Sequence, residues 1–170
     1  MTSTPRIILG IDPGFDQVGW AITKQTGSTT TLIDCGCIVT DRKRTRFERY
    51  MQIEQQLADI IKAYAPTAAG IEQLYAARNT TTVIPVAEAR GIIIGCLLRA
   101  NIQIHELNPS TIKSAVAGHG RADKAAMKKM VLLQLGNISA PLRTKVEKTL
   151  DDTIDAIGVA LTAATLRSSV

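Results

Sequence analysis

The sequence predicts a single α/β domain in which helices flank a mixed β-sheet. Three strand-like segments come first, at residues 6–12, 16–24 and 30–40, and helices and strands alternate after them. A length of 170 residues suits one domain with a sizeable core, and 45% of the residues are hydrophobic. Because the chain contains no internal repeat, low-complexity segment or interdomain linker, residues 1–170 are expected to form one domain.

The individual elements follow from local patterns. The second and third strands are joined through the turn-forming segment QTGST, which predicts an antiparallel meander. Apolar residues recur at helical spacing from Phe47 to Tyr64, and Pro66 lies just past the end of this helix. The remaining predicted elements are a strand at 68–72, a helix at 80–100, a strand at 102–106, and helices near 109–117, 122–135 and 144–167.

Four acidic residues fall where predicted elements begin or end. Asp12 ends the first strand, RIILGID, and Glu72 ends the strand within TAAGIEQ. Asp152 and Asp155 belong to the C-terminal segment LDDTIDAIGVAL. A carboxylate at the end of a hydrophobic strand lies at the rim of a buried sheet, where ligands commonly bind in α/β folds. The three segments could therefore bring four carboxylates together.

Such a group of carboxylates suits a divalent-metal nuclease. In phosphodiester hydrolysis, two Mg²⁺ ions about 4 Å apart stabilise the attacking and leaving oxygens. Mg²⁺ is a hard ion that prefers carboxylates to His or Cys ligands. Asp152 and Asp155 are three residues apart and share one face of a helix, but Asp151 lies four before Asp155. Spacing alone therefore does not choose between Asp151 and Asp152.

Each acidic residue also has a simpler interpretation. Asp12 precedes Pro13 and Gly14, so it could initiate a turn. Asp151 and Asp152 could favour the N-terminal dipole of the last helix. Glu72 is harder to explain in this way, because a partly buried carboxylate at the end of an apolar strand needs a partner. The joint occurrence of these residues favours the metal-site interpretation.

Five motifs resemble the RuvC resolvases, which cut Holliday junctions and belong to the ribonuclease H-like superfamily. They occur in the family's order and span nearly the whole chain: ILGIDPG at 8–14, IEQLYAARN at 71–79, EARG at 88–91, KSAVAGHGRADK at 113–124 and DTIDAIGVALT at 152–162. The resemblance implies a ribonuclease H-like mixed five-stranded sheet. It also implies a homodimeric endonuclease that nicks two opposed strands of a four-way DNA junction in recombination and repair.

The resemblance further implies roles for individual residues. Catalytic metal ligands are expected at Asp12, Glu72, Asp152 and Asp155, with the D-x-x-D-A pattern selecting Asp152 over Asp151. They would hold Mg²⁺, two ions per subunit, with Mn²⁺ able to substitute. Tyr75 matches an aromatic, commonly Phe in the family, that stacks on a base at the opened junction centre. The other expected DNA contacts are Arg78, Asn79, Lys113, His119, Arg121 and Lys124, of which the two lysines match basic positions near the scissile phosphate.

The positive charge is concentrated in one part of the sequence. Residues 113–148 contain eight basic and two acidic residues, a balance of +6, so the rest of the chain carries −1 of the net +5. This distribution suits a polyanion held near the acidic residues, although a solvated lysine-rich helix face would look the same. The GHG segment at 118–120 favours phosphate contact, if its glycines directly precede a helix N-terminus.

A second basic cluster, Arg42, Lys43, Arg44, Arg46 and Arg49, precedes or opens the helix at 47–64. Positive charge is unfavourable at a helix N-terminus, so this cluster is expected in a loop and the first helical turn. DNA contact and a solvated loop explain it equally well. Of the two histidines, His105 is expected to be structural, whereas His119 lies in the glycine-containing loop and could touch phosphate.

Small residues recur every four positions in the helix at 80–100, at Ala87, Gly91 and Gly95. Such a stripe permits close helix approach, either within one subunit or between two. A four-way junction has two-fold symmetry, which favours a symmetric dimer with one site for each cut strand. The RuvC resemblance points to the same interface and to a branch-migration motor of the RuvA and RuvB type as a further partner.

Other sequence features restrict the setting and the class of protein. Cys35, Cys37 and Cys96 lack metal-ligand spacing and are expected to be reduced, which together with the absence of a signal peptide indicates a cytoplasmic protein. An actin-like phosphotransferase would need two related domains, for which the chain has no room. A non-catalytic junction-binding protein, or a ribonuclease H-like nuclease acting on RNA hybrids or other branched DNA, remains as an alternative.

Overall fold

The computed structural model describes residues 4–74, 80–136, 138–149 and 151–166. Five strands and six helices lie in this part of the chain. In order they are β1 (Arg6–Asp12), β2 (Gln17–Thr26), β3 (Thr29–Val39), α1 (Arg46–Tyr64), β4 (Ala68–Glu72), α2 (Thr80–Arg99), β5 (Gln103–Leu107), α3 (Pro109–Ala117), α4 (Lys124–Gln134), α5 (Ala140–Glu147) and α6 (Asp151–Thr165). The predicted α/β class is confirmed, and so is the predicted order of elements as far as α4.

The strands form one mixed sheet in the order β3-β2-β1-β4-β5. β1 pairs antiparallel with β2, and β2 pairs antiparallel with β3, so the predicted meander is confirmed. β4 runs parallel to both β1 and β5. Because β1 and β4 are parallel neighbours, their carboxyl ends lie at the same edge of the sheet.

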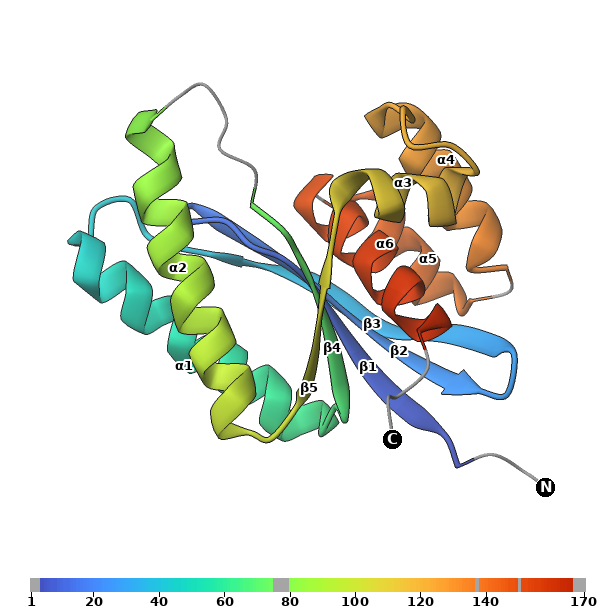
Figure 1. Cartoon of the computed structure of the whole chain (residues 1–170), viewed down its shortest axis with the longest axis horizontal. Helices are drawn as coiled ribbons and strands as arrows, with labels where there is room; N and C mark the ends of the chain where they lie inside the picture. The colour runs from blue at the N-terminus through green and yellow to red at the C-terminus, as the bar shows by residue number, and fades with distance from the viewer. Residues whose placement is uncertain (1–3, 75–79, 137, 150, 167–170) are drawn as a thin grey trace.

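Helices cover both faces of the sheet, with α1 and α2 on one face and α3 to α6 on the other (Figure 1). Successive residues of β1 therefore enter different cores. Ile8 packs in the core shared with α6, α3 and α4. Leu9 and Ile11 pack in the core shared with α1 and α2. Ile8, Leu9 and Ile11 are all completely buried, which fixes β1 in the centre of the molecule.

The helix predicted at 144–167 is wrong, because two helices occupy this region. α5 ends at Glu147, with Lys148 as its C-cap, and α6 starts at Asp151. The first turn of α6 carries Asp151 and Asp152, whose negative charge favours a helix N-terminus. α6 is buried along most of its length, whereas α5 is largely exposed, so the two helices differ in how they pack.

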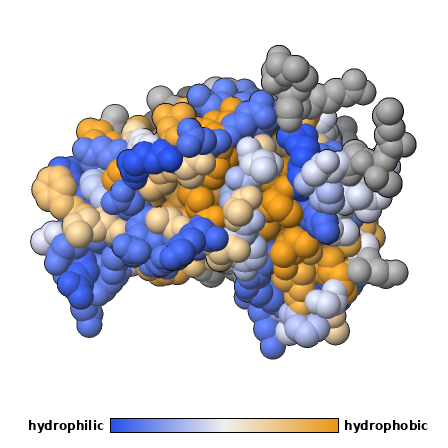
Figure 2. Space-filling model, turned by 90° about the horizontal axis from the view of Figure 1, so that it is seen from below, coloured by the Kyte–Doolittle hydropathy of each residue, from blue (hydrophilic) through white to orange (hydrophobic). Residues whose placement is uncertain are grey.

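Apolar residues also reach the surface, where Figure 2 shows hydrophobic patches between hydrophilic residues on the face viewed from below. Four of the exposed large hydrophobic residues belong to α1 and α2: Phe47, Met51, Ile84 and Leu98. Among the described residues, none of the helices has the length and the apolar character needed to cross a lipid bilayer.

Candidate active site

Two of the four predicted carboxylates lie side by side at the ends of neighbouring strands. Asp12 is the last residue of β1, and Glu72 is the last residue of β4. The parallel register pairs Ile11 with Ile71, so the next residue of each strand is one of these two acids. Burial raises the pKa of both groups, and the two side chains also act on each other: Glu72 raises the pKa of Asp12, and hydrogen bonding to Asp12 lowers that of Glu72.

The other two carboxylates come from α6, which lies very close to the sheet. An ideal Cβ on Gly10 of β1 would lie 2.3 Å from the carbonyl oxygen of Ala156, and one on Gly19 of β2 would lie 1.9 Å from that of Asp152. Only glycine leaves room for the helix backbone at these two positions. The first turns of α6 are thereby held against β1 and β2. This contact brings Asp152 and Asp155 to the edge of the sheet where Asp12 lies.

The electrostatics confirm that these groups lie close together. The pKa of Asp12 is raised to about 8, first by burial and then by the negative charges of Glu72, Asp155 and Asp152, in that order. Burial is also the main cause that raises the pKa of Glu72, with Asp155 adding to it. The pKa values of Asp152 and Asp155 are raised chiefly by burial as well. Like charges in one buried place favour either a proton or a cation between them.

This donor set fits a hard divalent cation. All four side chains offer oxygen atoms, which Mg²⁺, Ca²⁺ and Mn²⁺ prefer, and burial raises the pKa of each. Within the part of the chain that the structure describes, however, no three His, Cys, Asp or Glu side chains have the geometry to hold a metal ion. The carboxylates are grouped within electrostatic range without converging on one point.

Two lysines border the carboxylates on the α3 and α4 side. A hollow of about 210 Å³ is lined by Glu72, Pro109, Ile112, Lys113, Lys124, Met127 and Asp155. The charge of Lys113 lowers the pKa of both Glu72 and Asp155, and that of Lys124 lowers the pKa of Asp155 and Asp152. Both predicted basic positions therefore face the acidic group.

The neighbouring Asp151 has a different partner from Asp152. Its carboxylate lies 3.1 Å from the ammonium group of Lys124, and both side chains are exposed. Asp151 is absent from the charges that raise the pKa of Asp12, whereas Asp152 is among them. The charge of Asp151 raises the pKa of Asp152 and Asp155 but is not among the causes for Asp12, which favours Asp152 as the member of the carboxylate group.

A second hollow, of about 550 Å³, also reaches Asp152. Its lining residues come from the turn between β1 and β2, the start of β2, the segment after β3, α2 and α6: Gly14, Phe15, Asp16, Gln17, Arg42, Pro85, Val86 and Asp152. Sequence reasoning did not assign this surface. The signal that points to it is Arg49, a charged residue four positions before Ile53 on the buried stripe of α1.

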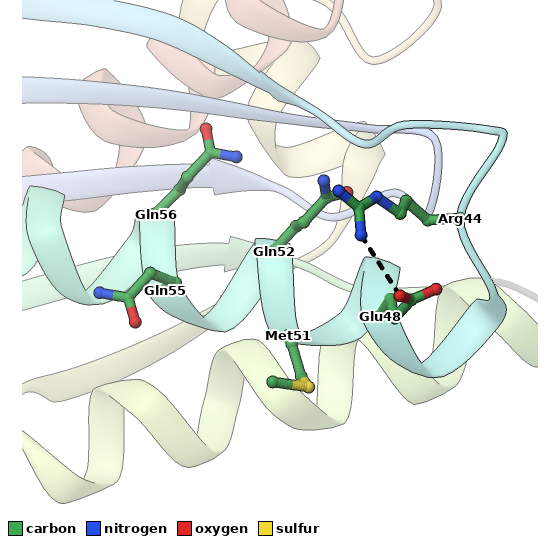
Figure 3. Close-up of a pocket in the computed structure, with 6 residues that line it drawn as sticks. All are labelled: Arg44, Glu48, Met51, Gln52, Gln55 and Gln56. Atoms are coloured by element: carbon green, nitrogen blue, oxygen red, sulfur yellow. Dashed lines mark hydrogen bonds and ion pairs between the residues drawn. The ribbon is translucent and has the colours of Figure 1, made fainter.

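A further hollow lies along α1, away from the carboxylate group (Figure 3). Its only acid, Glu48, is occupied by Thr45 in a capping box and by Arg44, at 3.3 Å. Met51 and Gln55 point to one side of the helix in Figure 3, and Gln56 points to the other. This hollow offers no group of converging charges.

The basic cluster at residues 42–49 is largely neutralised by acids of the same chain. Arg42 and Arg49 both pair with Asp16, the first at 2.6 Å. Arg44 lies near Asp41 and Glu48, and Arg46 lies 3.6 Å from Glu88. These contacts explain positive charges at the start of α1 without requiring DNA.

The GHG segment was expected directly before a helix N-terminus, and this expectation is wrong. Gly118 is the C-cap of α3 with a φ of 82°, and α4 begins only at Lys124. The N-terminus of α4 is capped by the side chain of Asp123, which accepts from the backbone of Ala126 at 2.8 Å. His119 and Arg121 lie exposed in the loop between the two helices.

Three of the predicted DNA contacts, Tyr75, Arg78 and Asn79, lie outside the described residues. His105 lies in β5, and burial, followed by the charge of Arg6, lowers its pKa. All three cysteines are free, and Cys35 and Cys96 are buried.

Known proteins are similar to this one over nearly the whole chain. Residues 8–163 match the family model described as crossover junction endodeoxyribonuclease RuvC. The RuvC protein of Petrotoga mobilis is 38% identical over 165 residues, covering 96% of both chains. That of Brachyspira hyodysenteriae is 41% identical over 158 residues, covering 93% of both chains.

Solved structures are also similar. The structure described as Thermus thermophilus RuvC in complex with Holliday junction substrate superposes with a TM-score of 0.81 at 26% identity, covering 94% of this chain and 93% of that one. The yeast mitochondrial Holliday junction resolvase Ydc2 has a TM-score of 0.67 at 15% identity, covering 92% of this chain and 77% of that one. The latter likeness shows the fold alone.

Proposed function

The chain belongs to the crossover junction endodeoxyribonuclease RuvC family, and we propose that it resolves Holliday junctions by nicking two opposed DNA strands. The observation that carries the proposal is the gathering of Asp12, Glu72, Asp152 and Asp155 at one edge of the sheet, in a chain matched by this family over residues 8–163. The Thermus relative bound to a junction supports the choice of substrate. We further propose that residues 1–170 form one nuclease domain.

We propose that the four carboxylates hold Mg²⁺, with two ions per subunit and with Mn²⁺ able to substitute. The ions, when bound, would stabilise the attacking and leaving oxygens of the scissile phosphate. Asp12 contributes the most strongly perturbed carboxyl, because it is buried among the other three acids. Its deprotonated form, and that of Glu72, would be favoured by a cation that replaces the shared proton.

Basic residues next to the acids would hold the DNA strand. Lys113 and Lys124 line the same hollow as Glu72 and Asp155, so a phosphate placed there would meet both signs of charge. Arg121 and His119, in the exposed loop between α3 and α4, are proposed as further phosphate contacts. Contacts of this kind position a nucleic acid without reading its sequence.

We propose that Tyr75 stacks on a base that is unpaired at the junction centre, with Arg78 and Asn79 as neighbouring DNA contacts. This proposal rests on the family motif. Base stacking on an aromatic side chain is worth about 1–3 kcal/mol. Tyr75→Ala should therefore lower junction cleavage more than it lowers metal binding, and unchanged cleavage would remove the stacking role.

We propose that the active form is a homodimer that uses α2 at its interface. A side chain added at Gly91 would meet nothing within 4 Å, and one at Gly95 would meet only the guanidinium group of Arg99. The small-residue stripe is therefore not used for packing within the subunit. Phe47, Met51, Ile84 and Leu98 are exposed on the same two helices, and a hollow lined by residues of both lies between them.

Two further proposals follow from family membership. The dimer would act with a branch-migration motor of the RuvA and RuvB type, which moves the junction along the DNA. It would act in the cytoplasm, a reducing compartment that suits three free cysteines. Neither proposal depends on the details of the carboxylate group.

Cleavage of a labelled synthetic four-way junction in Mg²⁺ tests the function, beside a linear duplex of the same sequence. We expect paired nicks in opposed strands of the junction, little cutting of the duplex, and no cutting by Asp12→Asn. Binding of the junction without cleavage by the wild-type protein would indicate a structural junction-binding protein instead.

A further inference from the structure

We propose that the hollow between the β1–β2 turn and α2 binds one nucleotide of the cut strand beside the scissile phosphate, and that Arg49 is the positioning residue that shapes it. This inference rests on the proposed function. The hollow measures about 550 Å³, within the range of roughly 300–1,000 Å³ that is usual for small-ligand sites.

The place of the hollow connects it to the chemistry. Asp152, a proposed metal ligand, forms part of its wall. Lys113, Lys124 and Glu72 line a different hollow, which also reaches the carboxylate group through Asp155. A strand whose phosphate lies at the carboxylates would therefore extend one neighbouring nucleotide into each hollow.

The walls of the hollow suit a nucleotide. Phe15, Pro85 and Val86 supply apolar surface for a base, and Arg42, whose side chain is 78% exposed, supplies a guanidinium group. Asp16 also lines the hollow, but its charge is paired with both Arg42 and Arg49. The paired carboxylate therefore repels a phosphate less than a free one would.

Arg49 fixes one wall of the hollow from inside the protein. Its side chain is only 10% exposed and forms an ion pair with Asp16. It donates to the hydroxyl oxygen of Thr40 at 2.7 and 2.9 Å and to the carbonyl oxygen of Phe15 at 3.4 Å. Its guanidinium carbon lies 3.8 Å from the centre of the Phe15 ring.

Thr40 completes this network from the end of β3. Its hydroxyl group donates to the carbonyl oxygen of Phe15 at 2.9 Å, and its backbone N–H donates to that of Asp16 at 3.0 Å. Arg49 and Thr40 together hold both backbone and side-chain groups of the turn that follows Asp12. The shape of this turn is therefore set by α1 and β3, which lie outside the carboxylate group.

Stability alone does not account for an arginine at this position. Arg49 occupies the buried stripe of α1 that continues with Ile53 and Leu57, where an apolar side chain would pack. Only the Arg49 side of its ion pair with Asp16 is buried, and Asp16 also pairs with Arg42, so an apolar residue at position 49 would leave this carboxylate with a partner. What an apolar residue cannot supply is the set of directed hydrogen bonds to Phe15, Asp16 and Thr40.

The test combines protein variants with abasic nucleotides. Four-way junctions would carry an abasic analogue on one or the other side of the scissile phosphate, and cleavage would be measured in single turnover with saturating enzyme. We expect one of the two substitutions to slow the wild-type protein about tenfold, because a base no longer fills the hollow. Arg49→Met should cut the intact junction about 10–100-fold more slowly, and the same abasic position should have little further effect.

Controls separate positioning from loss of folding. Arg6→Met removes a guanidinium group from the other end of β1, where it donates to Gln25 and to the carbonyl oxygen of Leu166, and should leave the cleavage rate and the abasic effect unchanged. Arg49→Lys should restore part of the rate, because lysine keeps the charge but not the guanidinium fork. Junction binding should change less than the cleavage rate in both Arg49 variants.

The outcomes distinguish this inference from the function on which it rests. If the wild-type protein does not cut the intact junction, the proposed function fails and the subsite fails with it. If it cuts, but neither abasic position slows it, the hollow does not bind a base. If the abasic and Arg49→Met effects multiply, Arg49 does not act through the hollow, and the positioning role is overturned.

Discussion

The backbone carbonyl oxygen of Asp152 lies 1.9 Å from the position that a Cβ atom on Gly19 would take. A central strand and the helix that carries two of the carboxylates are thus in direct backbone contact. The relative placement of Asp12 and Asp152 depends on this contact, because Gly19 is the residue paired with Asp12 across β1 and β2.

Gly19→Ala should displace the first turn of α6. We expect a loss of about 1–3 kcal/mol in the free energy of unfolding, as for other overpacked sites, and about a 100-fold loss of junction cleavage. Gly27→Ala is the matched control: Gly27 lies in the turn between β2 and β3, where an added Cβ would meet nothing within 4 Å, so the strain comes from its φ of 61°. Denaturant unfolding and cleavage assays would check both. Equal cleavage by the two variants would contradict the role of the close contact.

The stability of the metal-free protein should fall as the pH rises. The folded-state pKa of Asp12, about 8, lies above its ordinary value of 3.8, so folding favours the protonated carboxyl. The contribution of protonated Asp12 to the free energy of unfolding is fully present below about pH 4 and is lost as the pH rises through 8. Asp12→Asn cannot ionise, so its thermal stability relative to wild type should increase between pH 5 and 9. A constant difference across this range would show that Asp12 titrates normally.

Mg²⁺ should stabilise the protein more at pH 8 than at pH 6, because the ion competes with the proton held by Asp12. At about 100 times its dissociation constant, a ligand adds about 2.7 kcal/mol to the stability. Thermal melting with and without Mg²⁺ would measure the difference. Asp12→Asn should show a smaller effect of the ion, and an equal effect in both proteins would place the metal elsewhere.

Asp151 and Asp152 should differ sharply in function. Asp152→Asn should bind a junction and fail to cut it, because Asp152 contributes to the charge around Asp12. Asp151→Asn removes only an exposed pair with Lys124, at 3.1 Å, so stability should change by less than about 1 kcal/mol and cutting should persist. Parallel binding and cleavage assays would decide. The reverse result would make Asp151 the ligand.

A bulky residue in the stripe on α2 should prevent dimer formation. Gly91→Leu places a side chain where the subunit itself leaves open space, so the fold should persist while the second subunit is excluded. Light scattering during gel filtration would give the mass. Ala63→Leu, at an exposed position of α1, is the control. A Gly91→Leu dimer of unchanged stability would place the interface on another surface.

The sequence predicted the fold class and the grouping of carboxylates because both depend on local patterns, such as an apolar strand that ends in an acid. Strands β1 and β4 end in acids after apolar runs, and parallel pairing then requires Asp12 and Glu72 to meet. The break between α5 and α6 was missed because residues 144–167 are compatible with helix throughout. Only packing against the sheet shows that α6 must begin at Asp151.

Arg49 was missed for a different reason. In the sequence it is one of five basic residues between positions 42 and 49, and its helical spacing to Ile53 was not used to separate it from the others. Its partners, Phe15, Asp16 and Thr40, lie 9 to 34 residues away, so their contact arises only when α1 packs on the sheet. A buried charge of this kind can be recognised from helical spacing, but its partners cannot.

The arginines before and within α1 are paired with acids, and this pairing affects the side from which DNA would approach. Arg42, Arg44 and Arg46 form ion pairs with acids of the chain, whereas Lys128 and Arg143 donate to backbone carbonyl oxygens. Residues 113–148, with eight basic and two acidic residues, therefore contribute most of the positive long-range field. A polyanion would be attracted toward that side before any specific contact forms, so the orientation of the first encounter is set by charge pairing on the opposite side of the sheet.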